Sequence, residues 1–209
     1  EAIRLREGGF ELEIVALALG PSRSEDALRT ALALGADRAV HIETDAWLDP
    51  LTQARVIAKV VEAEGAQLVF VGGKQADWDS AALGPALAEV LGWPHSDWTT
   101  ALSLSDGSAR VKHDTDGGQE ELTLPLPAVI TTQQGLNEPR YPTLPNIMKA
   151  KRKELAKRDL AEFAPGAALT ELVSEDIQTQ GRRGVIVTGD AVSAAAELVR
   201  LLRDEAKVI

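Results

Sequence analysis

Apolar and polar positions alternate along the first hundred residues in the manner of a strand–helix–strand fold. Residues 11–19 form an almost unbroken apolar run, which is typical of a strand covered on both faces of a sheet. Acidic residues behind Ser24 and a stop at Gly35 predict a helix over residues 24–34. Repeated units of this kind predict a mostly parallel sheet with helices on both faces. Similar patterns predict the remaining elements: strands at 38–41 and 67–71, a helix beginning at Pro50, and a helix over 80–91.

Shorter segments follow Trp98 and predict antiparallel additions to the sheet. We expect hairpins built from residues 99–104, 109–114, 119–124 and 128–132, with Gly-containing turns at 106–107 and 116–118. The chain then divides into an α/β domain over residues 1–158, which includes a loop at 133–153, and a C-terminal arm over 159–209. The arm is expected to contain an irregular linker at 159–182, a strand at 184–187 and an amphipathic helix at 191–204. The expected fold class is α/β, of the Rossmann type.

Composition excludes several classes of protein. The 209 residues are 44% apolar but only 4% aromatic, so the core must be aliphatic. A net charge of −10 argues against general nucleic-acid binding. The absence of cysteine excludes disulfides and thiolate-metal sites. No apolar run reaches the roughly 18 residues of a membrane span, and the given residues show no signal-peptide pattern, so we expect a cytoplasmic protein.

The first residues, EAIRLREGG, have the pattern of a helix that Gly8-Gly9 would end. The chain thus begins partway into a helix, with Glu1 rather than methionine. We expect that a further N-terminal segment precedes it.

No group of side chains indicates catalysis. His41, His95 and His113 lie on separate predicted elements without metal-ligand spacing, so each is expected to be structural or exposed. The chain lacks a G-x-S-x-G elbow, a P-loop and a dinucleotide G-x-G-x-x-G motif. We therefore expect no catalytic residue and no metal site, as in a carrier whose chemistry belongs to a bound cofactor.

The loop after the strand at 67–71 is a candidate nucleotide site. Ligands of open parallel sheets bind where strands end and loops lead into helices. Gly72-Gly73 allows close backbone approach, Lys74 is positive, and Ser80 stands where it would cap a helix whose N-terminus favours phosphate. Asp77 and Asp79 would repel phosphate unless they cap the helix or face solvent. An ordinary helix start accounts for the same residues, so both interpretations stay open here.

A proline-rich segment is the second candidate site. Pro139, Pro142 and Pro145 prevent a helix or a central strand from running through it, which predicts an ordered surface loop. Surface loops are where binding functions concentrate. The basic run that follows, residues 149–158, would ordinarily be a solvated helix face. In an acidic protein it is also suited to steering an acidic partner.

Two stretches, GKQADWDSAALGPALAEVLGWP at 73–94 and GLNEPRYPTLPNIMKAKRK at 135–153, resemble the electron-transfer flavoprotein β-subunit family. The resemblance extends from GADRAVHI through MKAKRKE and implies an adenine-nucleotide α-hydrolase-like fold. It implies a heterodimer with an α subunit, whose FAD accepts electrons from acyl-CoA and related dehydrogenases and passes them to a quinone oxidoreductase. The chain would then be an electron-carrier subunit of fatty acid β-oxidation and no enzyme. Its location would be the bacterial cytoplasm, or the mitochondrial matrix in a eukaryote.

The resemblance also implies cofactor-binding residues. In the family, the first stretch wraps an AMP that is bound structurally rather than as a substrate. Its run is slightly shorter here than in some relatives, and family contacts near the N-terminus have no counterpart, which would weaken AMP binding. The positions that match are Leu19, Gly73, Lys74, Gln75, Ala76, Asp77, Trp78, Asp79, Ser80, Ala81, Ala82 and Leu83.

In the family, the second stretch docks on partner dehydrogenases, and a leucine inserts into an apolar pocket; Leu144 is its match. The prolines limit the loop's freedom, so a projecting leucine loses little entropy on binding. The alternative is that Leu144 packs beneath its own loop. The docking residues implied are Tyr141, Leu144, Pro145, Ile147, Met148, Lys149 and Arg152.

Two further residues are assigned to the subunit interface by the resemblance. Arg140 either pairs with Glu138 or faces the flavin side of the interface. Asp114 matches a glutamate of relatives that pairs with an arginine of the α subunit.

Two rival functions also stay open: an electron-bifurcating subunit with a second FAD in place of AMP, and a stand-alone adenine-nucleotide-binding protein. Ser80-Ala81-Ala82 departs from the Thr-Ala-Gln often seen in the bifurcating subgroup, and this difference argues against the electron-bifurcating function without excluding it.

Overall fold

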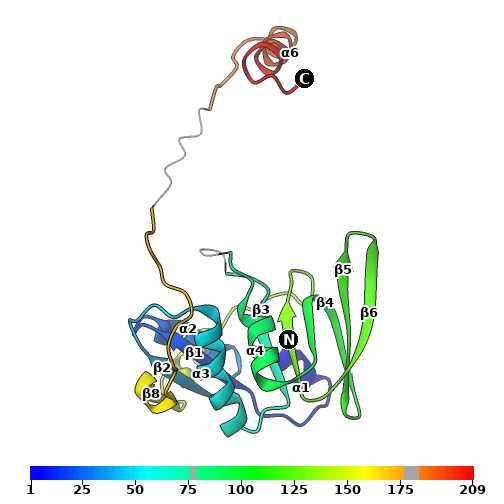
Figure 1. Cartoon of the computed structure of the whole chain (residues 1–209). Coiled ribbons are helices and arrows are strands. Elements are labelled where there is room, and N and C mark those ends of the chain that lie inside the picture. Colours follow the sequence, from blue (N-terminus) through cyan, green and yellow to red (C-terminus); the bar gives the residue numbers. More distant parts are fainter. Residues whose placement is uncertain (76–78, 177–183) are drawn as a thin grey trace. The chain divides into compact units, whose positions relative to one another are not determined.

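The computed structural model describes residues 1–75, 79–176 and 184–209, which form two compact units, Glu1–Leu172 and Val173–Ile209. The first unit is an α/β structure (Figure 1), which confirms the expected fold class. Its elements are α1 (Ala2–Glu7), β1 (Val15–Gly20), α2 (Ser24–Leu34), β2 (Arg38–Glu43), α3 (Pro50–Ala63), β3 (Leu68–Gly72), α4 (Leu83–Leu91), β4 (His95–Ser105), β5 (Ser108–Thr115), β6 (Gly118–Pro125), β7 (Ala128–Thr132), α5 (Leu144–Ala150), β8 (Leu155–Asp159) and the 3-10 turn η1 (Leu160–Phe163).

The strands form two sheets in place of the single sheet that the sequence predicts. One sheet is parallel throughout, in the order β1-β2-β8. The other has the order β3-β7-β4-β5-β6; β7 runs parallel to both β3 and β4, and β4, β5 and β6 form an antiparallel meander. The sequence predicts that the segment 128–132 forms a hairpin with the strand before it. This prediction is wrong, because β7 lies between β3 and β4.

Helix α3 packs against both sheets and so links them. Its N-cap Asp49 accepts a hydrogen bond from the Thr52 N–H at 2.7 Å, and Pro50 fills the first turn, where no N–H is needed. One side of the helix places Val56 and Val60 in an apolar cluster with β1 and β2. Its other side joins β3, β7 and α4 in a second cluster, and Figure 1 shows α3 and α4 side by side.

Several element boundaries differ from the predictions. Helix α4 begins at Leu83 rather than Ser80, and β1 begins at Val15 rather than residue 11. Helix α5 begins at Leu144, inside the proline-rich loop. Pro145 does not prevent this helix, because it falls in the first turn, where proline is tolerated. Strand β8 occupies charged residues that the sequence places on a helix face and at the start of a linker.

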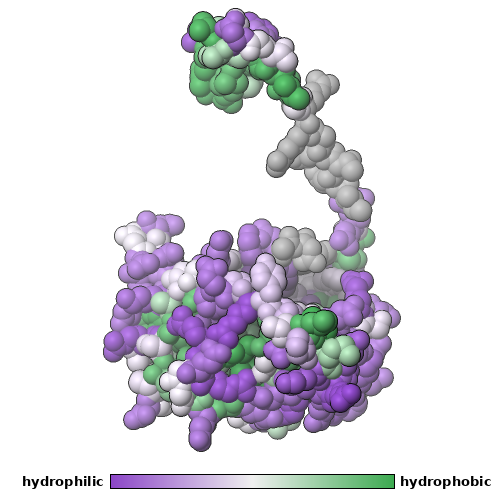
Figure 2. Space-filling model, turned by 180° about the vertical axis from the view of Figure 1, so that it is seen from behind, coloured by the Kyte–Doolittle hydropathy of each residue, from purple (hydrophilic) through white to green (hydrophobic). Residues whose placement is uncertain are grey.

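The second unit, Val173–Ile209, contains helix α6 (Ala191–Arg200) and a π-helical turn, Leu201–Glu205. Residues 184–187 form no strand, so that prediction is wrong, and the regular helix ends before the predicted residue 204. Asp190 caps α6 by accepting hydrogen bonds from the Val192 and Ser193 N–H groups. No residue of α6 is buried, and Figure 2 shows an apolar surface on this unit, to which Val192, Leu198 and Val199 contribute.

Among the residues that the structure describes, no helix is both long and apolar enough to cross a membrane.

Candidate nucleotide loop and docking surface

The candidate nucleotide loop leaves β3 at a tightly packed glycine. Gly73 is buried, and its N–H donates to the carbonyl oxygen of Thr132 in β7 at 3.1 Å. A Cβ atom at this position would lie 2.7 Å from two ring carbons of Trp98. Only glycine therefore fits where the loop begins. The structure shows a close approach of Gly73 to Trp98, and approach of this backbone to a ligand stays a prediction.

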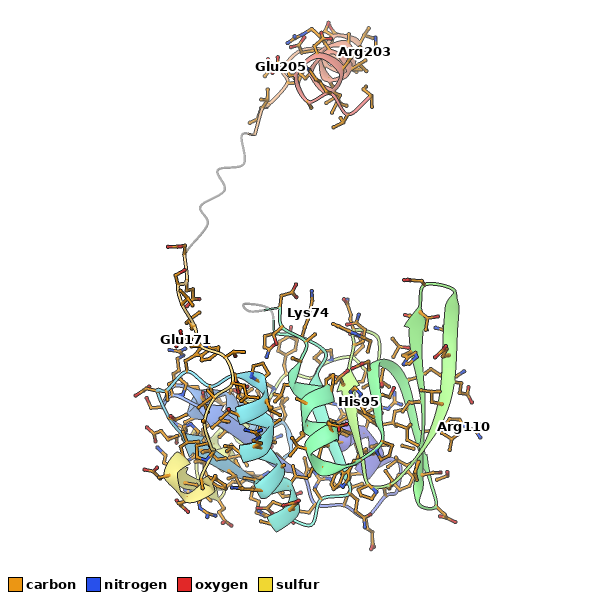
Figure 3. The ribbon with its side chains drawn as sticks, in the orientation of Figure 1. Lys74, His95, Arg110, Glu171, Arg203 and Glu205 are labelled. Atoms are coloured by element: carbon orange, nitrogen blue, oxygen red, sulfur yellow. The ribbon has the colours of Figure 1, made fainter. Side chains whose placement is uncertain are left out.

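Lys74 and Gln75 each contact Asp79, and Figure 3 shows Lys74 beyond the end of β3. The Asp79 N–H donates to the Gln75 carbonyl oxygen at 3.0 Å, and the Lys74 ammonium lies 2.5 Å from an Asp79 carboxylate oxygen. Asp79 is exposed and pairs with Lys74 instead of capping α4, so it offsets part of the lysine's positive charge. The Gln75 Oε1 atom is buried and has no hydrogen-bond partner among the described residues.

Helix α4 starts without a side-chain cap. Its N-cap is Ala82, and no side chain accepts a hydrogen bond from the first turn. The Ser80 Oγ accepts from the Ala82 N–H at 3.3 Å, so Ser80 does not cap the helix as the sequence predicts. Asp79 and Ala81 have positive φ angles of 54° and 51°, which is uncommon for residues with a side chain. Uncapped N–H groups at a helix start favour an anion.

The other predicted cofactor residues lie in different places. Leu19, at the end of β1, packs in the apolar cluster with Val40 and Ile42. Leu83, the first residue of α4, packs in the apolar cluster between α3 and α4. Ala76, Asp77 and Trp78 lie outside the described residues. Gly73, Lys74, Gln75 and residues 79–82 are thus the described members of this candidate site. An uncapped helix start and a buried, unpartnered amide oxygen at Gln75 fit a nucleotide phosphate and a hydrogen-bond donor such as an adenine amino group or a ribose hydroxyl.

The predicted docking residues gather on an exposed apolar surface. Tyr141 is 94% exposed and Leu144 is 72% exposed, so Leu144 does not pack beneath its own loop. Ile147 and Met148 are also exposed on α5. Scattered exposed apolar residues are normal, but four within eight positions form a patch typical of an interaction site. We call these four side chains the docking surface.

The remainder of α5 is held by contacts that the sequence does not reveal. Ala150 is buried against α2, and Arg29 of α2 donates to the carbonyl oxygens of Ala150 at 3.1 Å and Lys153 at 3.2 Å. The Lys153 ammonium donates in turn to the Leu32 and Ala36 carbonyl oxygens, at the C-terminal end of α2. Helix α5 is thus fixed at its C-terminal end, while its first turns stay exposed.

Apart from Lys153, which bonds the end of α2, the basic run divides into two groups. Lys157 pairs with Glu25 at 2.8 Å, and Arg158 pairs with Glu162 at 2.6 Å. Lys149, Lys151 and Arg152 are exposed and have no ion pair within the described part of the chain. Only the second group, next to the docking surface, is free to meet a partner's charges.

Arg140 pairs neither with Glu138 nor within its own loop. Its guanidinium forms two hydrogen bonds, of 2.6 Å and 2.5 Å, to the carboxylate of Glu7 in α1. This pair lowers the pKa of Glu7, and both side chains are exposed. The base of the loop borders a cleft of about 720 Å³ that also involves Phe70 and Thr132. The proline-rich loop is thus tied to the first helix of the chain.

Asp114 and the three histidines each have partners within the chain. Asp114 is exposed near the end of β5 and accepts a hydrogen bond from Gln119 at 2.9 Å. His41 is buried, with Nε2 at 3.1 Å from the Gly20 carbonyl oxygen. His113 bridges the Asp97 carbonyl oxygen and the Glu120 carboxylate, and His95 lies 3.1 Å from the carboxylate of Asp97. The described residues contain no group of three metal-ligating side chains.

The two sheets and their helices define an α/β domain, and residues 1–163 match the family described as electron transfer flavoprotein domain. The chain is 37% identical over its whole length to the electron transfer flavoprotein subunit beta of Bradyrhizobium diazoefficiens, covering 82% of that protein. It is 38% identical over its whole length to the mitochondrial subunit beta of Arabidopsis thaliana, again covering 82%. It is 40% identical to the subunit beta of Mus musculus over 96% of this chain and 82% of the relative. The chain belongs to the electron transfer flavoprotein β-subunit family, whose members are electron carriers rather than enzymes.

Proposed function

We propose that this chain is the β subunit of a heterodimeric electron-transfer flavoprotein. In this proposal an α subunit holds most of a shared FAD, and the chain closes one side of the flavin site. FAD, when bound, supplies the redox chemistry, so this chain's residues bind, orient and dock. Family membership over nearly the whole chain is the observation that carries the proposal.

We propose further that the loop from Gly73 to Leu83 binds AMP as a structural group. The uncapped start of α4 favours the phosphate, and the buried Oε1 of Gln75 is an acceptor that awaits a donor. Asp79 offsets part of the charge of Lys74. The remaining positive charge at this site comes from the backbone N–H groups and from this one shared ammonium. The AMP therefore depends on backbone contacts more than on side-chain charge.

The docking surface is proposed to bind acyl-CoA dehydrogenases and related donors, and the reduced flavin then passes electrons to a quinone oxidoreductase. Leu144 enters an apolar pocket of the dehydrogenase, while Lys149 and Arg152 orient the encounter. Exposed charges beside an apolar contact raise the association rate more than the affinity. The amphipathic helix α6 and Asp114 are assigned to contacts with the α subunit.

The testing experiment identifies the nucleotides that the protein holds. The chain is purified alone and after co-expression with its α subunit, then denatured, and the released nucleotides are quantified by mass spectrometry. Equal amounts of AMP and FAD from the heterodimer are expected. Two FAD per heterodimer without AMP would replace this proposal by an electron-bifurcating subunit. A nucleotide-loaded monomer with turnover would replace it by a stand-alone nucleotide-binding protein.

A further inference from the structure

Trp98 is held in a strained backbone conformation beside the start of the nucleotide loop. Its φ angle is 48°, in the left-handed region that bulky residues rarely adopt. The described residues include five such positions without glycine, and three of them are Asp79, Ala81 and Trp98. Two of these lie in the loop, and the third packs against Gly73, where the loop begins. Strain of this kind clusters at ligand-binding segments and persists only where the surroundings enforce it.

The surroundings of Trp98 account for how this conformation is kept. Strand β4 shifts its register against β7 between Ser96 and Thr99, and Trp98 lies inside this irregularity. The Trp98 N–H donates to the Thr131 hydroxyl at 2.9 Å, and that hydroxyl donates to the Asp97 carboxylate at 3.2 Å. Such irregularities are known to re-aim side chains next to functional sites. Here the re-aimed side chain is the indole that covers Gly73.

The same group of residues contacts both ends of the loop. Trp98 closes the space above Gly73 at the start. At the end, in the first turn of α4, a Cβ atom on Gly84 would overlap the methyl group of Thr131 and would lie 3.6 Å from His95 Nε2. Figure 3 shows His95 beside α4 and Lys74 beyond the end of β3. The irregular part of β4 and its partner Thr131 therefore set the positions of both loop ends.

We propose that Trp98 is a positioning residue for nucleotide binding: its ring, packed on the backbone of Gly73, sets the direction in which the loop leaves β3. This rests on the proposed function for the identity of the ligand, AMP. The contact is specific to one of two adjacent glycines. A Cβ on Gly72 would have no neighbour closer than the Lys74 carbonyl oxygen at 4.0 Å, so Gly72 is a matched control for Gly73.

The test combines single and double variants in the full-length protein co-expressed with its α subunit. The variants are Trp98→Ala, Trp98→Phe, Gly73→Ala, Gly72→Ala and the double variant Gly73→Ala with Trp98→Ala. Hydrogen exchange of the amides at 73–75 and 79–83 reports the loop without requiring a nucleotide. Titration with AMP then reports binding. Val111→Ala, in a buried position of β5, serves as a control for general destabilisation.

Trp98→Ala and Gly73→Ala are each expected to speed loop exchange and weaken AMP binding by about ten-fold, which corresponds to about 1.4 kcal/mol. Gly72→Ala and Trp98→Phe should stay near wild type, because both keep an aromatic ring over Gly73. The double variant should be little worse than Trp98→Ala alone, since the clash with the ring disappears and only a contact of 3.1 Å between the new Cβ and the Thr132 carbonyl oxygen remains.

Two results would overturn the inference: equal effects of Gly73→Ala and Gly72→Ala, or a change in Trp98→Ala that Val111→Ala reproduces in the loop. If the wild type binds no AMP, the proposed nucleotide fails, while loop exchange still decides the role of Trp98.

Discussion

At the scale of single residues, Asp49 connects two distant parts of the first unit. Its carboxylate caps α3, and its second oxygen accepts hydrogen bonds from the Leu169 and Thr170 N–H groups at 2.7 Å and 3.1 Å. Contacts with the Thr52 side chain and with these backbone N–H groups lower the pKa of Asp49 to about 2, against the ordinary value of 3.8. Asp49 is 2% exposed, so its donors have no water as a substitute.

Asp49 therefore makes stability depend on acidity. Because its folded-state pKa is lowered, its contribution is complete above pH 4 and declines as the pH falls through about 2. Thermal unfolding measured from pH 5 down to pH 2 should show a steeper loss of stability for the wild type than for Asp49→Asn, which keeps the cap but carries no charge. At pH 7, Asp49→Ala should cost about 2 kcal/mol, because buried N–H groups lose their acceptor. Parallel pH profiles for wild type and Asp49→Asn would contradict this role.

Gly84 offers a prediction in which two principles oppose each other. Alanine at a helix position is ordinarily favoured over glycine by about 1 kcal/mol. Here the added Cβ overlaps the Thr131 methyl group, and overpacking costs about 1–3 kcal/mol, so Gly84→Ala should destabilise. Denaturant unfolding of Gly84→Ala with Thr131→Ser should show recovery, because serine keeps the hydroxyl that bonds Trp98 but lacks the methyl. Continued destabilisation in the double variant would contradict this account.

Contacts within one turn of a residue can be predicted from the sequence, whereas contacts with distant segments cannot. The Asp49-Pro50 helix start is predictable, because the cap and the proline act within one turn. The long-range bonds of Asp49 to Leu169 and Thr170 are not, since nothing local to either segment encodes them. Gly73 is predicted to need a close approach, but its neighbour, Trp98, lies on another strand. The Glu7 partner of Arg140 is equally remote in sequence.

At the scale of elements, α5 presents the docking surface at its exposed first turns. Leu144→Ala should slow electron acceptance from an acyl-CoA dehydrogenase by about ten-fold or more, because a leucine in an apolar pocket contributes about 1.5–3 kcal/mol. Bound nucleotide should not change. The control is Leu169→Ala, a leucine of the same unit that is 71% exposed, against 72% for Leu144. Equal reduction rates for the two variants in a stopped-flow assay would remove the docking role.

The attachment of α5 to α2 is open to a separate test. Lys153 donates to two carbonyl oxygens at the end of α2. Lys153→Met keeps the length of the side chain but leaves these oxygens unpaired, which should cost about 1–3 kcal/mol and loosen α5. Lys151→Met, at an exposed position nearby, is the matched control. Hydrogen exchange of the α5 amides should rise in the first variant only.

Element prediction succeeded where the periodicity was strong and failed where tertiary pairing decided. Helices α2 and α3 match their apolar periodicity; α2 ends at Gly35 as predicted but begins without a side-chain cap, whereas Asp49 caps α3. Strand β8 was missed because LAKRD resembles a charged surface; its pairing with β2 makes it a strand. Strand β7 was placed in a hairpin, since sequence order cannot show that it inserts between β3 and β4. The apolar residues 184–187 form no strand, as strand propensity requires a neighbouring strand.

At the scale of the whole molecule, the two units differ in how they are stabilised. The first contains four clusters of buried apolar residues, whereas α6 in the second buries none. Deleting residues 173–209 should therefore leave the melting temperature of the first unit unchanged and weaken its association with the α subunit. Leu198→Asp, which breaks the apolar stripe of α6, should weaken association similarly in analytical ultracentrifugation. Unchanged association in both variants would assign α6 another role.

The docking surface also contains the one methionine of the chain, Met148. With no cysteine among the 209 residues, Met148 carries the only sulfur atom, and it is 56% exposed. Oxidation to the sulfoxide converts an apolar side chain into a polar one. Mild peroxide should therefore impair electron acceptance before it affects folding, and methionine sulfoxide reductase should restore it, whereas Met148→Leu should resist. Oxidative damage to this protein would thus act first on the surface that we propose for docking its electron donors.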